Sequence, residues 1–244
     1  EPVVLSYDLE CLSSDGGFPD PVKDPIICIG CWEGTSGVCF CWKDTPEHPS
    51  FETEKDMIHA FLQYVRQLSP DFLTGYNIDR FDNTYLEERC KQLRIPWKWS
   101  RLRGYNSKVK HVTTQSNQKG TQESWRLDMP GVCVIDAYLL MRGQHNLARY
   151  SLESVAQHFL GTGKDDMPYK QIPIKFQNPE GRKEIAEYCI KDAKLVIDLI
   201  VHLKKVINLV QMSKVTGCSP TDIVQRGQGI RTITLMLDYC YEDN

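Results

Sequence analysis

No run of about 18 uncharged apolar residues occurs in the sequence, so we expect no segment that spans a bilayer and no membrane partner. The first residues also lack the basic and apolar regions of a secretory signal peptide, which indicates an intracellular protein. An initiator methionine is absent as well, and the chain enters directly into an apolar run. We therefore expect a piece cut from a longer intracellular protein.

An excess of positive charge is missing too. The 244 residues carry a net charge of −3, which argues against a module that holds nucleic acid by bulk electrostatic attraction. The charge does not exclude an enzyme that meets nucleic acid through metal ions, because bound divalent cations would cancel several carboxylates.

The ten cysteines do not form the regular pattern of a disulfide framework. They are scattered, and many lie inside apolar runs, so we interpret them as reduced intracellular thiols. A zinc site at Cys28, Cys31, Cys39 and Cys41 is an alternative, but its spacing is only partly right. Both pairs lie in strand-like sequence, which favours packed core thiols.

Strand-like and helical segments alternate along the chain and predict an α/β layer structure. Three strands at the start suggest an antiparallel opening to the sheet, and a later short strand should return parallel to the first. The expected strands are 3–11, 26–33, 38–42, 71–76 and 132–135. The expected helices are 53–68, 81–93, 136–143, 151–159, 180–210 and 220–239, with a linker at 161–179.

Residues 97–131 differ from the rest because basic side chains stand among polar ones. Segments 108–114 and 121–129 could pair as an inserted β-hairpin across a loop at 117–120. Lys108 and Lys110 make this hairpin either a solvated insertion or a basic surface that touches a nucleic-acid strand.

Two acidic residues stand close together on the first strand. Asp8 and Glu10 are two apart, so strand alternation puts both on one face. Two carboxylates on one face of an apolar strand repel each other and are costly to bury, and divalent cations would offset both costs. The alternative is a strand end that reaches solvent.

Asp82 and Asp192 each allow a functional and a structural interpretation. Asp82 follows the strand at 71–76 at the start of a helix, where α/β folds place ligands, although an Asp there is commonly a helix cap. Tyr188 and Asp192 are four apart on a predicted helix and share a face. They could serve one site, or be a core-rim Tyr and a surface Asp.

Taken together, these residues resemble the exonuclease domain of family B DNA polymerases, most closely the delta type of eukaryotes and large DNA viruses. Residues 6–11 (SYDLEC) resemble its first motif, 75–82 (GYNIDRFD) its second and 188–193 (YCIKDA) its third. The segments 24–27, 150–152 and 226–229 also match, so the resemblance covers nearly the whole chain. Thr84 stands where family members often have Pro.

The resemblance implies a ribonuclease H-like mixed sheet flanked by helices. It also implies 3′→5′ proofreading hydrolysis with two divalent cations, Mg²⁺ or Mn²⁺. Asp8 would bridge both ions, Glu10 and Asp192 would complete the ion that binds the attacking water, and Asp82 would serve the second ion. Tyr188 would orient the water.

Substrate residues are expected as well. Asn77 and Phe81 would contact the last nucleotides of a single-stranded 3′ end, with Phe81 stacking on a base. Core packing is the alternative for Phe81. Lys108 and Lys110 are the candidate contacts of the hairpin.

The resemblance also implies a larger context. Residues 1–210 would form the exonuclease domain, and 211–244 a helical extension toward a missing polymerase palm. Because no palm motif such as Tyr-Gly-Asp-Thr-Asp occurs, we expect this chain itself not to polymerise DNA. Its partners would be primer-template DNA, the remainder of the polymerase and a sliding clamp reached through that remainder, in the nucleus or a viral replication compartment.

Two other functions stay open at this point. One is a stand-alone 3′→5′ exonuclease on DNA or RNA, against which the palm-like stretch 226–237 speaks. The other is a catalytically inactive structural module, in which the acids are usually lost.

Overall fold

The computed structural model describes residues 1–102, 104–116, 120–163 and 167–242. Its centre is a six-stranded sheet of order β4-β3-β2-β1-β5-β8. The strands are β1 (Val4–Cys11), β2 (Ile26–Glu33), β3 (Ser36–Trp42), β4 (Ser50–Phe51), β5 (Phe72–Gly75) and β8 (Cys133–Asp136). β1 pairs antiparallel with β2 and parallel with β5. The predicted mixed sheet, with its antiparallel opening and parallel return, is confirmed.

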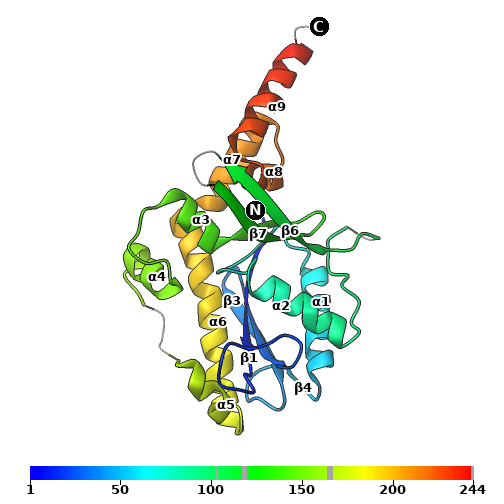
Figure 1. The fold of residues 1–244 in the computed structure, drawn as a ribbon, viewed down its shortest axis with the longest axis vertical. Coiled ribbons are helices and arrows are strands. Elements are labelled where there is room, and N and C mark those ends of the chain that lie inside the picture. Colours follow the sequence, from blue (N-terminus) through cyan, green and yellow to red (C-terminus); the bar gives the residue numbers. More distant parts are fainter. Residues whose placement is uncertain (103, 117–119, 164–166, 243–244) are drawn as a thin grey trace. The chain divides into compact units, whose positions relative to one another are not determined.

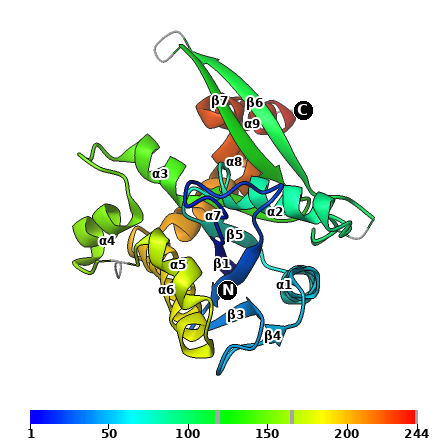
Figure 2. The ribbon, with the colours of Figure 1, turned by 60° about the horizontal axis from the view of Figure 1, so that its bottom comes forward.

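Helices cover both faces of this sheet, with α1 on one side and α6 on the other (Figures 1 and 2). Helix α1 (Glu54–Leu68) begins where the Thr53 side chain accepts a hydrogen bond from the Asp56 N–H at 3.1 Å. It ends at Ser69, whose left-handed backbone is followed by Pro70. The second helix of this region is α2 (Asp82–Gln92).

The sheet sorts its two faces by alternation along β1. Leu5, Tyr7 and Leu9 are buried in the main core with the apolar faces of α1 and α2. The intervening Asp8 and Glu10 therefore project from the opposite face. On that face a second, smaller core joins β2 and β3 to α5 (Ile172–Lys175) and α6 (Pro179–His202).

The predicted hairpin forms, as β6 (Lys108–Ser116) and β7 (Gly120–Asp128). The two strands pair antiparallel in register from Lys108 opposite Asp128 to Ser116 opposite Gly120. Residues 117–119 of the expected loop lie outside the described residues. Leu127 and Met129 anchor the base of the hairpin in the main core.

The helices predicted at 136–143 and 151–159 are present as α3 (Ala137–Gln144) and α4 (Leu152–Leu160). The prediction of a linker at 161–179 is wrong in part, and its residues 164–166 lie outside the described residues. The segment contains η1 (Tyr169–Gln171) and α5. Sequence hides both because Pro168 and Pro173 look like helix breakers, whereas Pro168 precedes η1 and Pro173 lies in the first turn of α5, where Pro is tolerated.

The helix expected at 180–210 is interrupted, which corrects the prediction. α6 ends at His202, Lys204 adopts a left-handed φ of 52°, and α7 (Lys205–Thr216) follows. No Gly or Pro marks this break, so the apolar periodicity of the sequence predicted one continuous helix. The helix expected at 220–239 likewise divides into α8 (Pro220–Gln225) and α9 (Gly227–Glu242).

The chain forms two compact units, residues 1–197 and 198–244. The functional boundary expected at residue 210 stays a prediction. Within the second unit, Cys218 after α7 contacts the Thr234 hydroxyl of α9 at 3.0 Å. Among the helices of the described residues, none combines the length and apolar character that crossing a membrane requires.

Candidate active site

Three carboxylates meet at the exposed end of the β1–α6 contact. One carboxylate oxygen each from Asp8, Glu10 and Asp192 lie within 4.8 Å of one another. Asp8 and Glu10 are half-buried, and Asp192 is buried at 3% exposure. The structure thus brings together the predicted strand pair and the predicted helix acid, from positions more than 180 residues apart in sequence. The alternative of a surface Asp at 192 is wrong.

Helix α6 reaches this position because β2 has a glycine beneath it. A Cβ at Gly30 would lie 2.6 Å from the carbonyl carbon of Cys189 and 2.8 Å from its Sγ, so any larger residue would push the helix away. The Gly30 N–H instead donates to Cys189 Sγ at 3.2 Å. Tyr188 precedes that cysteine, is half-buried and lies one turn before Asp192 on the same helix.

Asp82 is the first residue of α2 and is 2% exposed. Its Oδ1 accepts a hydrogen bond at 3.2 Å from the Leu9 N–H, the amide between the two β1 acids. The helix-cap interpretation is wrong, because the cap position is Phe81 and carries no side-chain cap bond. Asp82 is fixed to the β1 backbone beside the acidic cluster, outside the set of three whose oxygens share the 4.8 Å limit.

The site is built at a high electrostatic cost. Burial, followed by the neighbouring Cys189 sulfur and three carboxylates, raises the pKa of Asp8 well above its usual value. Burial raises the pKa of Asp82 to about 7. Such carboxylates destabilise the fold when ionised alone, and a divalent cation held between their oxygens would offset the repulsion. Hard oxygen donors of this kind suit Mg²⁺ or Mn²⁺ rather than softer ions.

The loop that carries Asp82 is fixed by an acid that the sequence reasoning missed. Asp136, at the end of β8, accepts from the N–H of Asn77 at 3.0 Å with Oδ1 and from the N–H of Asp79 at 3.2 Å with Oδ2. Its Oδ1 also accepts from the N–H of Tyr138 at 2.9 Å and so caps α3. An Asp directly before a helix was the available signal, but it predicts only the cap.

Asp79 extends this network to the hairpin. Its Oδ1 accepts from the Leu127 N–H at 3.3 Å and from the Asn83 amide at 3.2 Å. Burial, and then the charge of Asp136, raises the pKa of Asp79 to about 7. The segment between β5 and α2 is therefore bonded on one side to β8 and on the other to β7.

The predicted substrate residues occupy different environments. Asn77 is half-buried in that loop with a left-handed φ of 63°. Phe81 is half-buried, with ring centroids 5.2 Å from Phe18 and 5.3 Å from Tyr85, so it packs at the rim of the core as its alternative supposed. On the hairpin, Lys108 and Lys110 are exposed, and Lys110 Nζ lies 2.5 Å from an Asp128 carboxylate oxygen.

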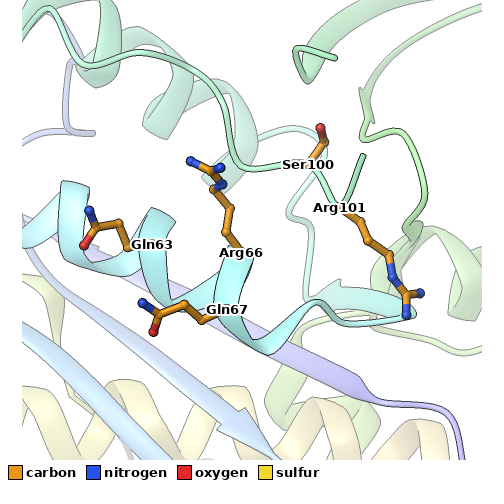
Figure 3. Close-up of a pocket in the computed structure, with 5 residues that line it drawn as sticks. All are labelled: Gln63, Arg66, Gln67, Ser100 and Arg101. Carbon is orange, nitrogen blue, oxygen red and sulfur yellow. The ribbon is translucent and has the colours of Figure 1, made fainter. Parts of the chain in front are cut away.

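A separate pocket lies beside α1 and the segment after α2 (Figure 3). This cavity of about 480 Å³ is lined by the polar side chains of Gln63, Arg66, Gln67, Ser100 and Arg101. None of these five residues is acidic, and none belongs to the acidic cluster. Because α1 covers the sheet face opposite Asp8 and Glu10, we place the chemistry at the cluster and not in this cavity.

The sequence of this chain matches a known protein family. The profile described as "DNA polymerase family B, exonuclease domain" matches residues 1–155. The chain belongs to this family. The matched segment contains Asp8, Glu10 and Asp82 and ends before Tyr188 and Asp192. Exonuclease domains of this family are metal-dependent, and the carboxylate cluster provides this chain with ligands for a metal.

Individual relatives define the type more closely. The chain is 33% identical to the DNA polymerase delta catalytic subunit of Glycine max over 99% of its own length and 24% of the relative's. It is 32% identical to that of Bos taurus, over 96% of this chain and 22% of the relative. The predicted delta-type exonuclease domain is confirmed, and the chain spans about a quarter of the length of these relatives.

A solved structure supports the fold. The family B DNA polymerase from the hyperthermophilic archaeon Pyrobaculum calidifontis matches with a TM-score of 0.72, covering 99% of this chain and 29% of that one. Identity is 24%, so this likeness concerns the fold alone. The predicted ribonuclease H-like mixed sheet flanked by helices is confirmed.

Proposed function

We propose that this chain is the proofreading part of a replicative, delta-type DNA polymerase and removes 3′-terminal nucleotides from single-stranded or mismatched DNA ends. The observation that carries the proposal is the meeting of Asp8, Glu10 and Asp192 within 4.8 Å. Asp82, bonded to the amide between the two strand acids, supplies a fourth carboxylate next to them. An inactive structural module would gain nothing from keeping these mutually repelling groups buried.

Two divalent cations, Mg²⁺ or Mn²⁺, would supply an activated water and stabilise the departing 3′ oxygen when bound there. Asp8 is assigned as the ligand that both ions would share. The other three acids all lie close enough to Asp8 for their negative charges to raise its pKa. Glu10 and Asp192 would complete the site of the attacking water. Asp82 would hold the second ion, directly or through water.

Tyr188 is assigned to orient the attacking water. It stands one helical turn from Asp192, so its hydroxyl belongs to the same face of α6. The role is one of positioning, because a hydroxyl on this face can orient a water through a hydrogen bond.

The substrate is a frayed 3′ end. A mismatched, unpaired 3′ terminus reaches the acidic cluster more often than a terminus that is still paired with its template. Asn77 and Phe81 border the Asp82 loop and would contact the last nucleotides. Lys108 is the hairpin residue with the stronger claim to a phosphate contact, since Lys110 already faces Asp128. Primer-template DNA is the natural source of such an end.

The remainder of a polymerase chain is the proposed partner. Helix α9 exposes large apolar side chains along its length, as expected of a segment that leads into further structure. These side chains are Ile233, Leu235, Met236, Leu237, Tyr239 and Tyr241. A sliding clamp would be reached through that remainder. The place of action would be the nucleus or a viral replication compartment.

The direct test is Asp8→Ala combined with Glu10→Ala, assayed for release of mononucleotides from 3′-labelled single-stranded DNA with Mg²⁺. We expect release to fall by at least about 10³-fold, because metal-assisted hydrolysis loses its ligands. The double variant should remain folded, since it removes a buried repulsion. Undiminished release would refute the assignment.

A matched control removes two exposed acids on either side of β4. Asp44→Ala with Glu52→Ala changes the net charge equally but lies outside the cluster. We expect it to retain the wild-type rate, which separates loss of ligands from loss of charge.

A further inference from the structure

Three cysteine thiols gather between the sheet and α6, on the inner side of the acidic cluster. Cys28 comes from β2, Cys39 from β3 and Cys189 from α6, and their sulfur atoms lie within 4.8 Å of one another. Their exposures are 3%, 0% and 0%. This set differs from the four cysteines that the sequence spacing had suggested, because Cys31 belongs to the main core on the other face of the sheet.

The strand register produces the gathering. Cys28 lies opposite Cys41, and Gly30 lies opposite Cys39, so Cys28 shares one face of the sheet with Cys39 and Cys41. Gly30 leaves the room that Cys189 Sγ occupies, since a Cβ there would lie 2.8 Å from that sulfur. The close packing of α6 on β2 therefore brings Cys189 next to the cysteines of β2 and β3.

We propose that Cys28, Cys39 and Cys189 bind one thiophilic divalent cation of the Zn²⁺ class, at a site separate from the carboxylates. Zinc–sulfur bonds of about 2.3 Å in a tetrahedral arrangement separate the sulfur atoms by about 3.8 Å, within reach of the observed limit. Carboxylates select hard cations and thiolates select soft ones, so the two neighbouring sites take different metals.

The surroundings suit a metal thiolate. The Gly30 N–H points at Cys189 Sγ from 3.2 Å, and an amide donor of this kind stabilises negative charge on sulfur. Binding follows Zn²⁺ + 3 RSH → [Zn(SR)₃]⁻ + 3 H⁺, in which no atom changes oxidation state.

A fourth ligand is close at hand. Cys41 is two residues from Cys39 on the same strand face, is 2% exposed, and directs its Sγ toward the Cys39 carbonyl oxygen at 3.7 Å. A change of its side-chain rotamer would complete a four-sulfur site. Such a site would cross-link β2, β3 and α6.

The cross-link would bear on the carboxylates through Cys189. Its Sγ lies 3.3 Å from the Asp8 carbonyl oxygen and 3.8 Å from Asp8 Oδ2. A soft cation would thus hold α6 against β1 without occupying the hydrolytic site. The proposal goes beyond the nuclease assignment and its test does not require activity.

The test uses Co²⁺, whose thiolate complexes absorb by sulfur-to-metal charge transfer. The buried site calls for refolding the reduced chain under argon with Co²⁺, followed by removal of loosely bound ions with excess Mg²⁺. We expect one tightly bound Co²⁺ per chain with charge-transfer and tetrahedral visible bands, both abolished by Zn²⁺. Absence of charge-transfer absorption in the refolded wild type would overturn the proposal.

Matched variants locate the ligands. Cys189→Ala and Cys39→Ala should each weaken the absorption, because each removes a sulfur ligand, whereas Cys90→Ala, which removes a buried thiol from α2, should keep its full intensity. Circular dichroism establishes that each variant is folded. Should Cys189→Ala fail to refold, Cys39→Ala provides the same reading. Charge transfer of wild-type intensity in either folded ligand variant would also overturn the proposal.

Discussion

Replacing Asp136 with alanine is expected to destabilise the protein and to reduce its nuclease activity, although Asp136 is neither a proposed ligand nor a substrate contact. Its carboxylate caps α3 and accepts the N–H groups of Asn77 and Asp79 in the loop that leads to Asp82. Asn77 has a left-handed φ of 63°, a conformation that costs a non-glycine residue about 1 kcal/mol. Without Asp136, that loop loses the bonds that hold this conformation.

The magnitude follows from these bonds. Loss of a helix cap costs about 0.5–2 kcal/mol. A buried N–H left without an acceptor costs about 1–3 kcal/mol, and the Asp79 amide would be in that position. Burial raises the pKa of Asp136, so removing its carboxylate returns part of that cost. We expect a net loss of about 2–3 kcal/mol in the free energy of unfolding.

Urea denaturation and the single-turnover rate of mononucleotide release measure the two effects. Ser219→Ala is the control, because it removes the cap of α8 in the other compact unit of the chain, where Ser219 accepts from the Asp222 N–H at 3.1 Å. It should cost about 1 kcal/mol without affecting the rate. The Asp136 variant should be slower by at least about tenfold, since small displacements of a ligand are costly. A wild-type rate in folded Asp136→Ala would refute the positioning argument.

The remaining predictions concern pH, water and DNA. The pKa of Asp79 is raised to about 7, so its protonated form is favoured in the fold; its contribution to stability is fully present below about pH 4 and is lost as pH rises through about 7. Asp79→Asn should flatten this fall in the free energy of unfolding, and an unchanged pH profile would contradict the assigned burial. Tyr188→Phe should slow release by about 10- to 10²-fold with unchanged Mn²⁺ affinity by calorimetry, and a parallel loss of affinity would point to a ligand role instead. Charge reversal at Lys108 and Lys110 should weaken binding of single-stranded DNA and flatten its salt dependence, mostly through Lys108, because Lys110 already pairs with Asp128; affinity equal to that of the wild type would remove the hairpin from the interface.

Much of the fold was predictable because its signals are local. Alternation in β1 and the helical face of α1 are read directly from neighbouring residues. The errors arose where the signals are weak or depend on packing. β4 has two residues and no pattern of its own, and Lys204 ends a helix in a left-handed conformation that sequence usually assigns to Gly or Asn.

The candidate site divides in the same way. Spacing alone predicted that Asp8 and Glu10 share a face, and that Tyr188 and Asp192 share another. That these faces meet depends on Gly30, whose missing side chain lets α6 approach β2, and no local pattern shows this. Asp136 was missed for a related reason: its cap role is local and visible, whereas its hold on a loop about 60 residues earlier exists only in the folded chain.

The most direct test of the central claim, that these carboxylates hold the hydrolytic metal ions, is anomalous diffraction from crystals soaked in Mn²⁺ with a 3′-terminal deoxynucleoside monophosphate. We expect two peaks about 3.5–4 Å apart. One peak should be bound by Asp8, Glu10 and Asp192, and the other should lie toward Asp82. Saturating Mn²⁺ that leaves no peak at Asp8, or that binds only elsewhere on the chain, would contradict the account.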